Sequence, residues 1–146
     1  MEIKDFLAPS HVMIDVRTSD KARLLRELAG RAAIALDLSA DLVANALSKR
    51  EELGSTGTGG GVAFPHARLD GVTEPFGMLV RLAKAIDFDA IDDQPVDIVF
   101  VLLLPAKSAG EQLNALACAA RALRDPDTLR NLRHAGDEAG LYRAVT

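Results

Sequence analysis

A glycine-rich stretch near the middle of the chain carries the residues best suited to chemistry. Residues 54–66 read GSTGTGGGVAFPH, so a flexible loop with hydroxyl side chains leads directly into Pro65 and His66. Successive backbone amides in such a loop can form a concave site for an anion, with Ser55 and Thr56 as further donors. The same glycines are also compatible with a plain surface turn, and His66 with a structural histidine near a strand end.

Several common sites with similar composition do not fit this stretch. A nucleotide-binding Walker A loop ends in Gly-Lys-Ser/Thr and opens a helix, whereas this loop leads into Val-Ala-Phe-Pro. A dinucleotide-binding fingerprint has the order strand, loop, helix, whereas here a predicted helix precedes the loop and a predicted strand follows it. The chain has no Gly-x-Ser-x-Gly motif of a serine hydrolase. Its histidines, His11, His66 and His134, are too widely separated to predict a metal site.

Neighbouring carboxylates occur at Glu51-Glu52 and at Asp92-Asp93. Adjacent residues on a helix or turn do not face each other, and such pairs are usually solvated surface. We therefore expect no catalytic role for either pair.

The elements that must position the loop follow from the spacing of apolar residues. Val12, Ile14 and Val16 alternate as in a strand, and the nearly continuous apolar run 96–104 is typical of a strand covered on both faces. Helices on either side of several strands predict an α/β fold, a single three-layer domain with a central mixed β-sheet flanked by helices on both faces. The further strands are expected at 62–64 and 76–83, and the helices at 20–36, 40–53, 108–123, 126–135 and 137–145, with N-caps at Ser19-Asp20, Ser39 and Ser108.

Composition limits the class of protein. With 146 residues, 49% hydrophobic and 26% charged, the chain has the size and balance of one globular domain spanning 1–146. Its net charge is -4, and its densest basic region, 121–133, is interrupted by Asp125 and Asp127, so we expect no nucleic-acid binding. No segment predicts a signal peptide or stable membrane insertion, and a single cysteine cannot form an intrachain disulfide. We expect a cytoplasmic protein.

The stretch from Arg50-Glu51 through GSTGTGGGVAFPH strongly resembles the active-site signature of a known family. This family comprises the fructose/mannitol-type IIA domains of the bacterial phosphoenolpyruvate-dependent phosphotransferase system. FDAIDDQPVDIVFVLLLPA resembles the family's following strand region, and LRNLRHAGDEAGLYRAV resembles its C-terminal helices. The resemblance thus covers essentially the full chain as one type-2 IIA domain, and is strongest to the stand-alone nitrogen-regulatory members.

The resemblance implies specific roles. His66 would accept a phosphoryl group from the phosphohistidine of a small HPr-type carrier protein, and Arg50 would lie near that group. Catalysis would then be mostly positioning and electrostatic stabilisation by a phosphoryl-transfer protein rather than a turnover enzyme, without metal or cofactor. The phosphoryl-binding residues would be Ser55, Thr56, Gly57 and Gly60.

The chain departs from the family pattern at one position. Members usually carry a second histidine early in the helix that follows the long apolar strand, where this chain has Gln112. A glutamine amide can donate a hydrogen bond to a phosphoryl oxygen but cannot titrate or carry charge. Our hypothesis is that Gln112 lies beside His66 as a neutral substitute; the alternative is a solvent-facing helix residue.

Three functions follow from the resemblance. The first is a nitrogen-branch regulatory protein whose phosphorylation on His66 controls binding to cytoplasmic partner proteins. The second is a sugar-specific component that relays phosphate from His66 to a IIB domain for sugar uptake. The third, motivated by Gln112, is a binding module that has lost phosphorylation.

Overall fold

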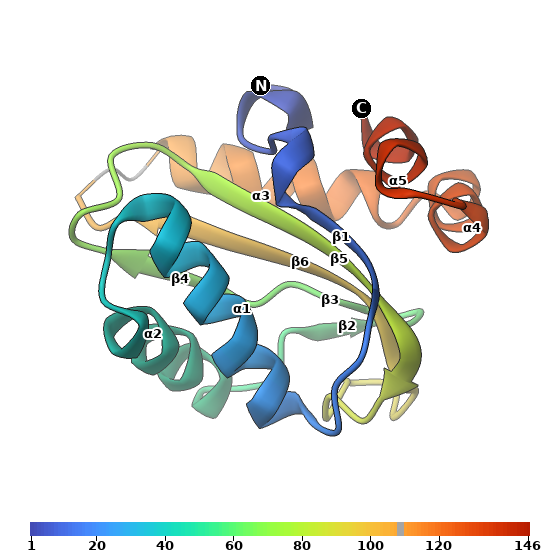
Figure 1. Ribbon diagram of the computed structural model, residues 1–146, viewed down its shortest axis with the longest axis horizontal. Coiled ribbons are helices and arrows are strands. Elements are labelled where there is room, and N and C mark those ends of the chain that lie inside the picture. The colour runs from blue at the N-terminus through green and yellow to red at the C-terminus, as the bar shows by residue number, and fades with distance from the viewer. Residues whose placement is uncertain (108–109) are drawn as a thin grey trace.

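A computed structural model describes residues 1–107 and 110–146, and within helix α3 it leaves the side chains of residues 111 and 112 undescribed. The described chain forms a mixed sheet with helices on both faces (Figure 1). No described helix is long and apolar enough to cross a membrane. The elements are η1 (Ile3–Asp5), η2 (Pro9–His11), β1 (Val12–Val16), α1 (Lys21–Leu36), α2 (Ala40–Glu52), β2 (Gly57–Gly59), β3 (Val62–Ala63), β4 (His66–Leu69), β5 (Phe76–Ile86), β6 (Val96–Pro105), α3 (Gly110–Ala122), α4 (Pro126–His134) and α5 (Glu138–Val145).

The sheet is built around two long strands. β5 and β6 pair antiparallel, β1 joins β5 in parallel, and β3 and β4 both join β6 in parallel. The order is β1-β5-β6-β3-β2, with β4 pairing β6 beside β3. This mixed sheet confirms the predicted α/β class.

Strand β6 separates two hydrophobic cores, as its continuous apolar sequence predicts. Val99, Val101 and Leu103 belong to the core under α1 and α2, whereas Phe100 and Leu102 belong to the core under α3, α4 and α5. Figure 1 shows these two groups of helices on opposite faces of the sheet. Because successive strand residues point to opposite faces, a strand buried on both sides must be apolar at every position.

The edge of the sheet next to β6 is interrupted between β3 and β4. Ala63 pairs with Val99 and His66 pairs with Leu102, so the register is unchanged across the gap. Within the gap, Leu102 N donates to the carbonyl of Pro65 at 2.9 Å, and Phe64 N donates away from β6 to Thr56 O at 3.0 Å. Proline has no backbone N–H to donate, and it forces the preceding residue into an extended conformation. The interruption therefore frees the carbonyl of Phe64 for another donor.

Most predicted elements are confirmed, including the N-caps of the first two helices. Arg23 N donates to Asp20 Oδ1 at 2.8 Å, and Leu42 N donates to Ser39 Oγ at 3.3 Å. Ser108, the predicted cap of the helix after β6, lies outside the described residues. The sequence analysis did not predict β2 and β4, because one is Gly-Thr-Gly and the other is four residues long behind a proline.

Gly57 lets the glycine loop pass close to the turn before β6. A Cβ on Gly57 would lie 2.8 Å from Ala90 Cβ and 2.9 Å from Ala90 Cα, so the two backbones would have to separate. We expect Gly57→Ala to lower the free energy of unfolding by about 1–3 kcal/mol. Gly30→Ala is the matched control, because Gly30 lies inside α1 with nothing within 4 Å of its added Cβ. It should stabilise the protein by about 0.5–1 kcal/mol. Urea unfolding tests both, and equal effects of the two changes would contradict the close approach at Gly57.

Candidate functional site

His66 stands at the first position of β4, and its ring orientation is fixed by the backbone just before it. Its Nδ1 lies 2.8 Å from the carbonyl oxygen of Phe64, the group freed by the interrupted sheet edge. A carbonyl oxygen can only accept, so Nδ1 carries the ring hydrogen. The other ring nitrogen, Nε2, therefore holds the lone pair and is available as a nucleophile.

Arg50 reaches the same nitrogen from the last turn of α2. Its Nε donates to His66 Nε2 at 3.4 Å, and its Nη1 donates to the carbonyl of Gly54 at 2.8 Å. A guanidinium has only donors, so this contact also requires an unprotonated Nε2. Gly54 has a φ of +148°, a conformation open to glycine. The turn after α2 thereby anchors the guanidinium beside the imidazole.

The surroundings of His66 lower its pKa from the ordinary value. Burial is the largest cause, because it penalises the charged ring, and the positive charges of Arg50 and Arg68 act in the same direction. The hydrogen bond to Phe64 and the negative charge of Glu51 oppose the shift. The net result favours a neutral imidazole at pH 7.

Two hollows meet at this histidine. One, of about 520 Å³, lies between the glycine loop and α3; the other, of about 410 Å³, lies along α2 and β4. Only part of His66 is buried, so an anion in either hollow can reach the ring. His66 and Arg50 line both. The first is further lined by Ser55, Thr56, Thr58, Phe64, Leu116, Ala117, Ala120, Arg121 and Arg124, and the second by Ala46, Lys49, Leu53, Ala67 and Arg68.

The structure brings part of the expected phosphoryl-binding set to His66. Ser55 and Thr56 line the first hollow, but Ser55 Oγ donates to Phe88 O at 2.8 Å and the Thr56 hydroxyl donates to Glu51. Phosphoryl binding by these hydroxyls stays a prediction that requires them to change partners.

The two glycines of that set do not line either hollow. Gly57 N donates to Ser55 Oγ at 3.0 Å, and Gly60 N donates to Asp92 Oδ2 at 3.0 Å. Arg133 in turn donates to Gly60 O at 2.7 Å. In this conformation the glycines dock the loop onto neighbouring elements, and their role as anion donors is an untested prediction.

The expectation that Glu51 is solvated surface is wrong. Its side chain is 6% exposed, forms an ion pair with Lys21 Nζ at 2.9 Å and accepts hydrogen bonds from the backbone and hydroxyl of Thr56. Lys21 also donates to Phe88 O at 3.3 Å. Consecutive residues at the end of α2 therefore diverge: Arg50 faces His66, Glu51 faces inward and Glu52 faces solvent. This buried pair ties the start of α1 to the loop beside the histidine.

Three residues of the first hollow were missed by sequence reasoning. The Thr58 hydroxyl is exposed and has no hydrogen-bond partner among the residues that the structure describes. Arg121 and Arg124 come from the basic region that Asp125 appeared to break up. The available signal was helical spacing, since residues 117, 120 and 121 share one face of α3 and Arg124 follows in the turn after it.

Gln112 lies in α3, but its side chain is outside the described part of the structure. Its position beside His66 therefore stays a hypothesis. In the described residues no three His, Cys, Asp or Glu side chains are grouped as metal ligands would be.

The lowered pKa of His66 gives a pH prediction. Nε2 is free above the pKa of the folded protein and protonated below it, so a lowered pKa keeps the nucleophile available at pH values under about 6.5. We expect Arg50→Gln to raise the pKa of His66 without restoring its ordinary value, because burial remains. Ring-proton NMR titration measures both, and Arg143→Gln, remote on α5, is the control. A wild-type midpoint at or above 6.5 would contradict the assigned environment.

The buried Glu51 should matter for stability as well as for position. Glu51→Ala leaves Lys21 and the Thr56 amide without their partner, and we expect a loss of about 2–4 kcal/mol in the free energy of unfolding. This is below the full cost of a buried pair because the Lys21 side chain is 17% exposed. Glu52→Ala, the exposed neighbour, should change the free energy by less than about 0.5 kcal/mol. Denaturant unfolding compares the two, and equal effects would refute the network.

Comparisons with known proteins identify the family of this chain. The family model described as "Phosphoenolpyruvate-dependent sugar phosphotransferase system, EIIA 2" matches residues 5–146. A nitrogen regulatory protein of Bradyrhizobium diazoefficiens is 40% identical over 145 residues, covering 99% of this chain and 95% of that protein. A fructose-specific EIIA component of Haloferax volcanii is 38% identical over 95 residues, covering 65% and 62%.

The fold also closely resembles that of a solved structure. The crystal structure of the nitrogen regulatory protein IIA-Ntr from Neisseria meningitidis superposes with a TM-score of 0.93 at 33% identity, covering 99% of both chains. The match of residues 5–146 to the family model, together with relatives of this identity, confirms the resemblance seen in the sequence. The chain belongs to the EIIA type-2 family of the phosphoenolpyruvate-dependent phosphotransferase system.

Proposed function

We propose that this protein is a nitrogen-branch IIA regulatory protein that is phosphorylated on Nε2 of His66 by an HPr-type phosphocarrier. Its phosphorylation state would control its binding to partner proteins in the cytoplasm. The observation that carries the proposal is the geometry of His66: Nδ1 is engaged by Phe64 O, so the lone pair of Nε2 lies beside Arg50 at two open hollows.

The transfer step uses groups already in place. The Nε2 lone pair attacks phosphorus, a P–N bond forms to His66, and the P–N bond to the carrier's histidine breaks with its electron pair returning to the carrier. The hydrogen stays on Nδ1 throughout and is donated to Phe64 O. Arg50, 3.4 Å from Nε2, is within reach of the phosphoryl oxygens, and the free hydroxyl of Thr58 is a further candidate donor.

The lowered pKa of His66 supports this step. A protonated Nε2 has no lone pair to attack with, whereas burial and nearby cations disfavour that proton. Gln112 stays our candidate for the position of the usual second histidine. As a neutral amide it would stabilise a phosphoryl oxygen without taking part in proton transfer.

A sugar-transport role is the alternative, and the fructose-specific relative favours it. In that role the phosphoryl group would pass from His66 to a IIB domain. The Bradyrhizobium nitrogen regulatory relative covers 99% of this chain, whereas the fructose-specific relative covers 65% of it. This difference favours the regulatory function over sugar transport. The two functions share the same acceptor and differ in what takes the phosphoryl group next.

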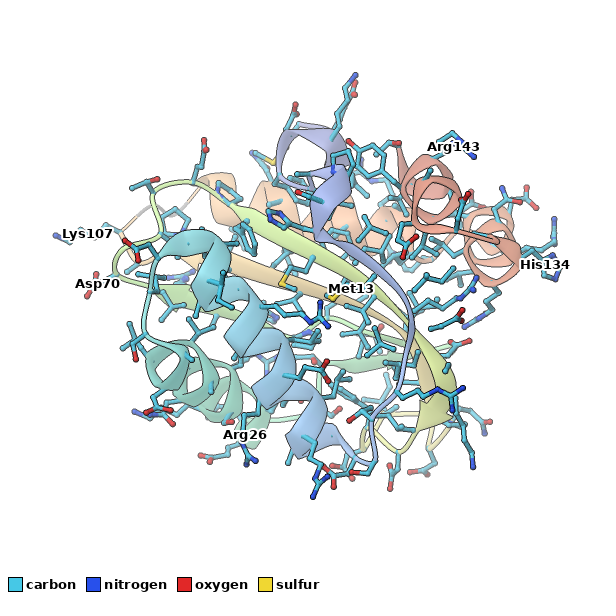
Figure 2. The ribbon with its side chains drawn as sticks, viewed as in Figure 1. Met13, Arg26, Asp70, Lys107, His134 and Arg143 are labelled. Carbon is cyan, nitrogen blue, oxygen red and sulfur yellow. The ribbon has the colours of Figure 1, made fainter. Side chains whose placement is uncertain are left out.

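Intact mass spectrometry tests the acceptor directly. Incubation with phosphoenolpyruvate, enzyme I and an HPr-type carrier should add one phosphoryl group to the wild type and none to His66→Ala. His134→Ala is the control, because His134 is exposed on α4 and points away from the body of the protein (Figure 2). Arg50→Gln should still be phosphorylated, but about 10²-fold more slowly.

The outcome separates the functions. No added mass in the wild type would reject both phosphotransfer functions and favour a pure binding module. Mass that persists in His66→Ala would reject the acceptor. If phosphorylated protein loses its phosphoryl group when a fructose-type IIB domain is added, the result would favour the sugar-uptake function over regulation.

A further inference from the structure

Lys21 is the first residue of α1, and its ammonium group is held inside the protein. The side chain is 17% exposed, with Nζ 2.9 Å from Glu51 Oε2 and 4.6 Å from the centre of the Phe88 ring. Nζ also donates to Phe88 O at 3.3 Å, in the loop before β6, and the exposed Asp89 lies 3.7 Å away. A cation in the first turn of a helix is opposed by the helix dipole. A residue that breaks a local preference in this way often serves a nearby site.

The two groups that Lys21 contacts are the acceptors for two hydroxyls of the first hollow. The Thr56 hydroxyl donates to Glu51, and Thr56 N donates to the same carboxylate at 3.1 Å. The Ser55 hydroxyl donates to Phe88 O at 2.8 Å. One ammonium group therefore holds the partners of both side chains in place.

Hydrogen bonds continue from Thr56 to the imidazole of His66. Phe64 N donates to Thr56 O at 3.0 Å, and Phe64 O accepts from His66 Nδ1 at 2.8 Å. Thr56 is 2% exposed and Phe64 is 5% exposed. Water therefore does not readily replace a bond that is lost from this chain. A shift of the Glu51 carboxylate would reach Nδ1 through two backbone residues.

A second connection leads from Glu51 to the other ring nitrogen. Glu51 directly follows Arg50 in the last turn of α2, so the bonds that fix its carboxylate also fix the direction in which Arg50 leaves the helix. Arg50 Nε donates to His66 Nε2 at 3.4 Å. The Lys21–Glu51 pair is thus connected to both nitrogens of the imidazole.

We infer that Lys21 is a positioning residue for His66: through Glu51 it orients the imidazole so that Nδ1 stays engaged and Nε2 faces the hollows. Neither Lys21 nor Glu51 is among the described residues that line the two hollows, so both act on the ring and not on a bound phosphoryl group. The effect on phosphoryl transfer rests on the proposed phosphorylation of His66, whereas the effect on the ring does not. A misaligned lone pair slows attack without weakening the docking of the carrier.

The ring orientation is measured by ¹⁵N NMR of the His66 imidazole, in the full chain at a pH above its pKa. The wild type should be the Nδ1–H tautomer. Lys21→Met keeps the apolar stem but removes the charge, and should move about 10% or more of the population to the Nε2–H tautomer. Lys84→Met is the matched control, because Lys84 is exposed on β5, and it should leave the tautomer unchanged.

The effect on transfer is measured with phosphoenolpyruvate, enzyme I and an HPr-type carrier. Lys21→Met should lower the rate at saturating carrier about tenfold, and the carrier concentration at half-maximal rate should stay within about twofold of the wild type. Lys84→Met should match the wild type in both.

A double variant tests whether Lys21 acts through Glu51. Lys21→Met/Glu51→Gln has no unpaired buried charge, so it is expected to fold even where Lys21→Met alone does not. Its tautomer should still shift, and its rate should be no lower than that of Glu51→Gln alone, because residues that act through one another have non-additive effects.

Four results decide the inference. A less stable Lys21→Met protein with a single Nδ1–H tautomer and the wild-type rate would reduce the pair to a stabilising contact and overturn the positioning role. A double variant with the wild-type tautomer would overturn it as well. Losses of rate that multiply in the double variant would contradict the route through Glu51. If the wild type is not phosphorylated at all, the proposed function fails, while the tautomer of Lys21→Met still decides the positioning role.

Discussion

The hydrogen bond between His66 Nδ1 and the carbonyl of Phe64 is the interaction on which the candidate site depends. It fixes the tautomer, because the carbonyl can only accept, and it thereby places the lone pair on the nitrogen that faces Arg50 and the hollows. The carbonyl is free because Pro65 interrupts the edge of the sheet while Leu102 keeps the register. Pro65 thus leaves the Phe64 carbonyl, next to β6, free to accept the hydrogen bond from His66.

The glycine loop supports this geometry mainly by packing. Gly57 allows the backbone to approach Ala90, and Gly60 receives contacts from Asp92 on one side and Arg133 on the other. Glu51 holds Thr56 from within the protein. These contacts hold the loop residues that do line the first hollow, Ser55, Thr56 and Thr58, so a loop with much conformational freedom in the unfolded chain has a specific position in the folded one.

Much of the fold could be predicted from the sequence, because its signals are local. The run in β6 and the caps Asp20 and Ser39 each indicate their element without knowledge of distant residues. The short strand β4 could not be predicted in this way, because its pairing depends on β6, more than thirty positions later. His66 and Arg50 were predicted from the family signature, whereas the buried position of Glu51 was missed because its partner, Lys21, lies on another helix. Helical spacing could have placed Arg121 on one face with its neighbours, but only the packing of α3 and of the turn after it brings Arg121 and Arg124 to the loop.

The positive charges around His66 have two effects that act in the same direction. Positive charges near an imidazole raise the energy of its protonated form and lower the energy of an anion attached to it. Burial lowers the pKa of His66 most, and Arg50 and Arg68 lower it further, which favours a free Nε2; Arg121 and Arg124 would stabilise a negative phosphoryl group in the first hollow. If His66 is phosphorylated as proposed, the same charges would favour both the neutral imidazole and the phosphorylated product over the protonated, unreactive ring.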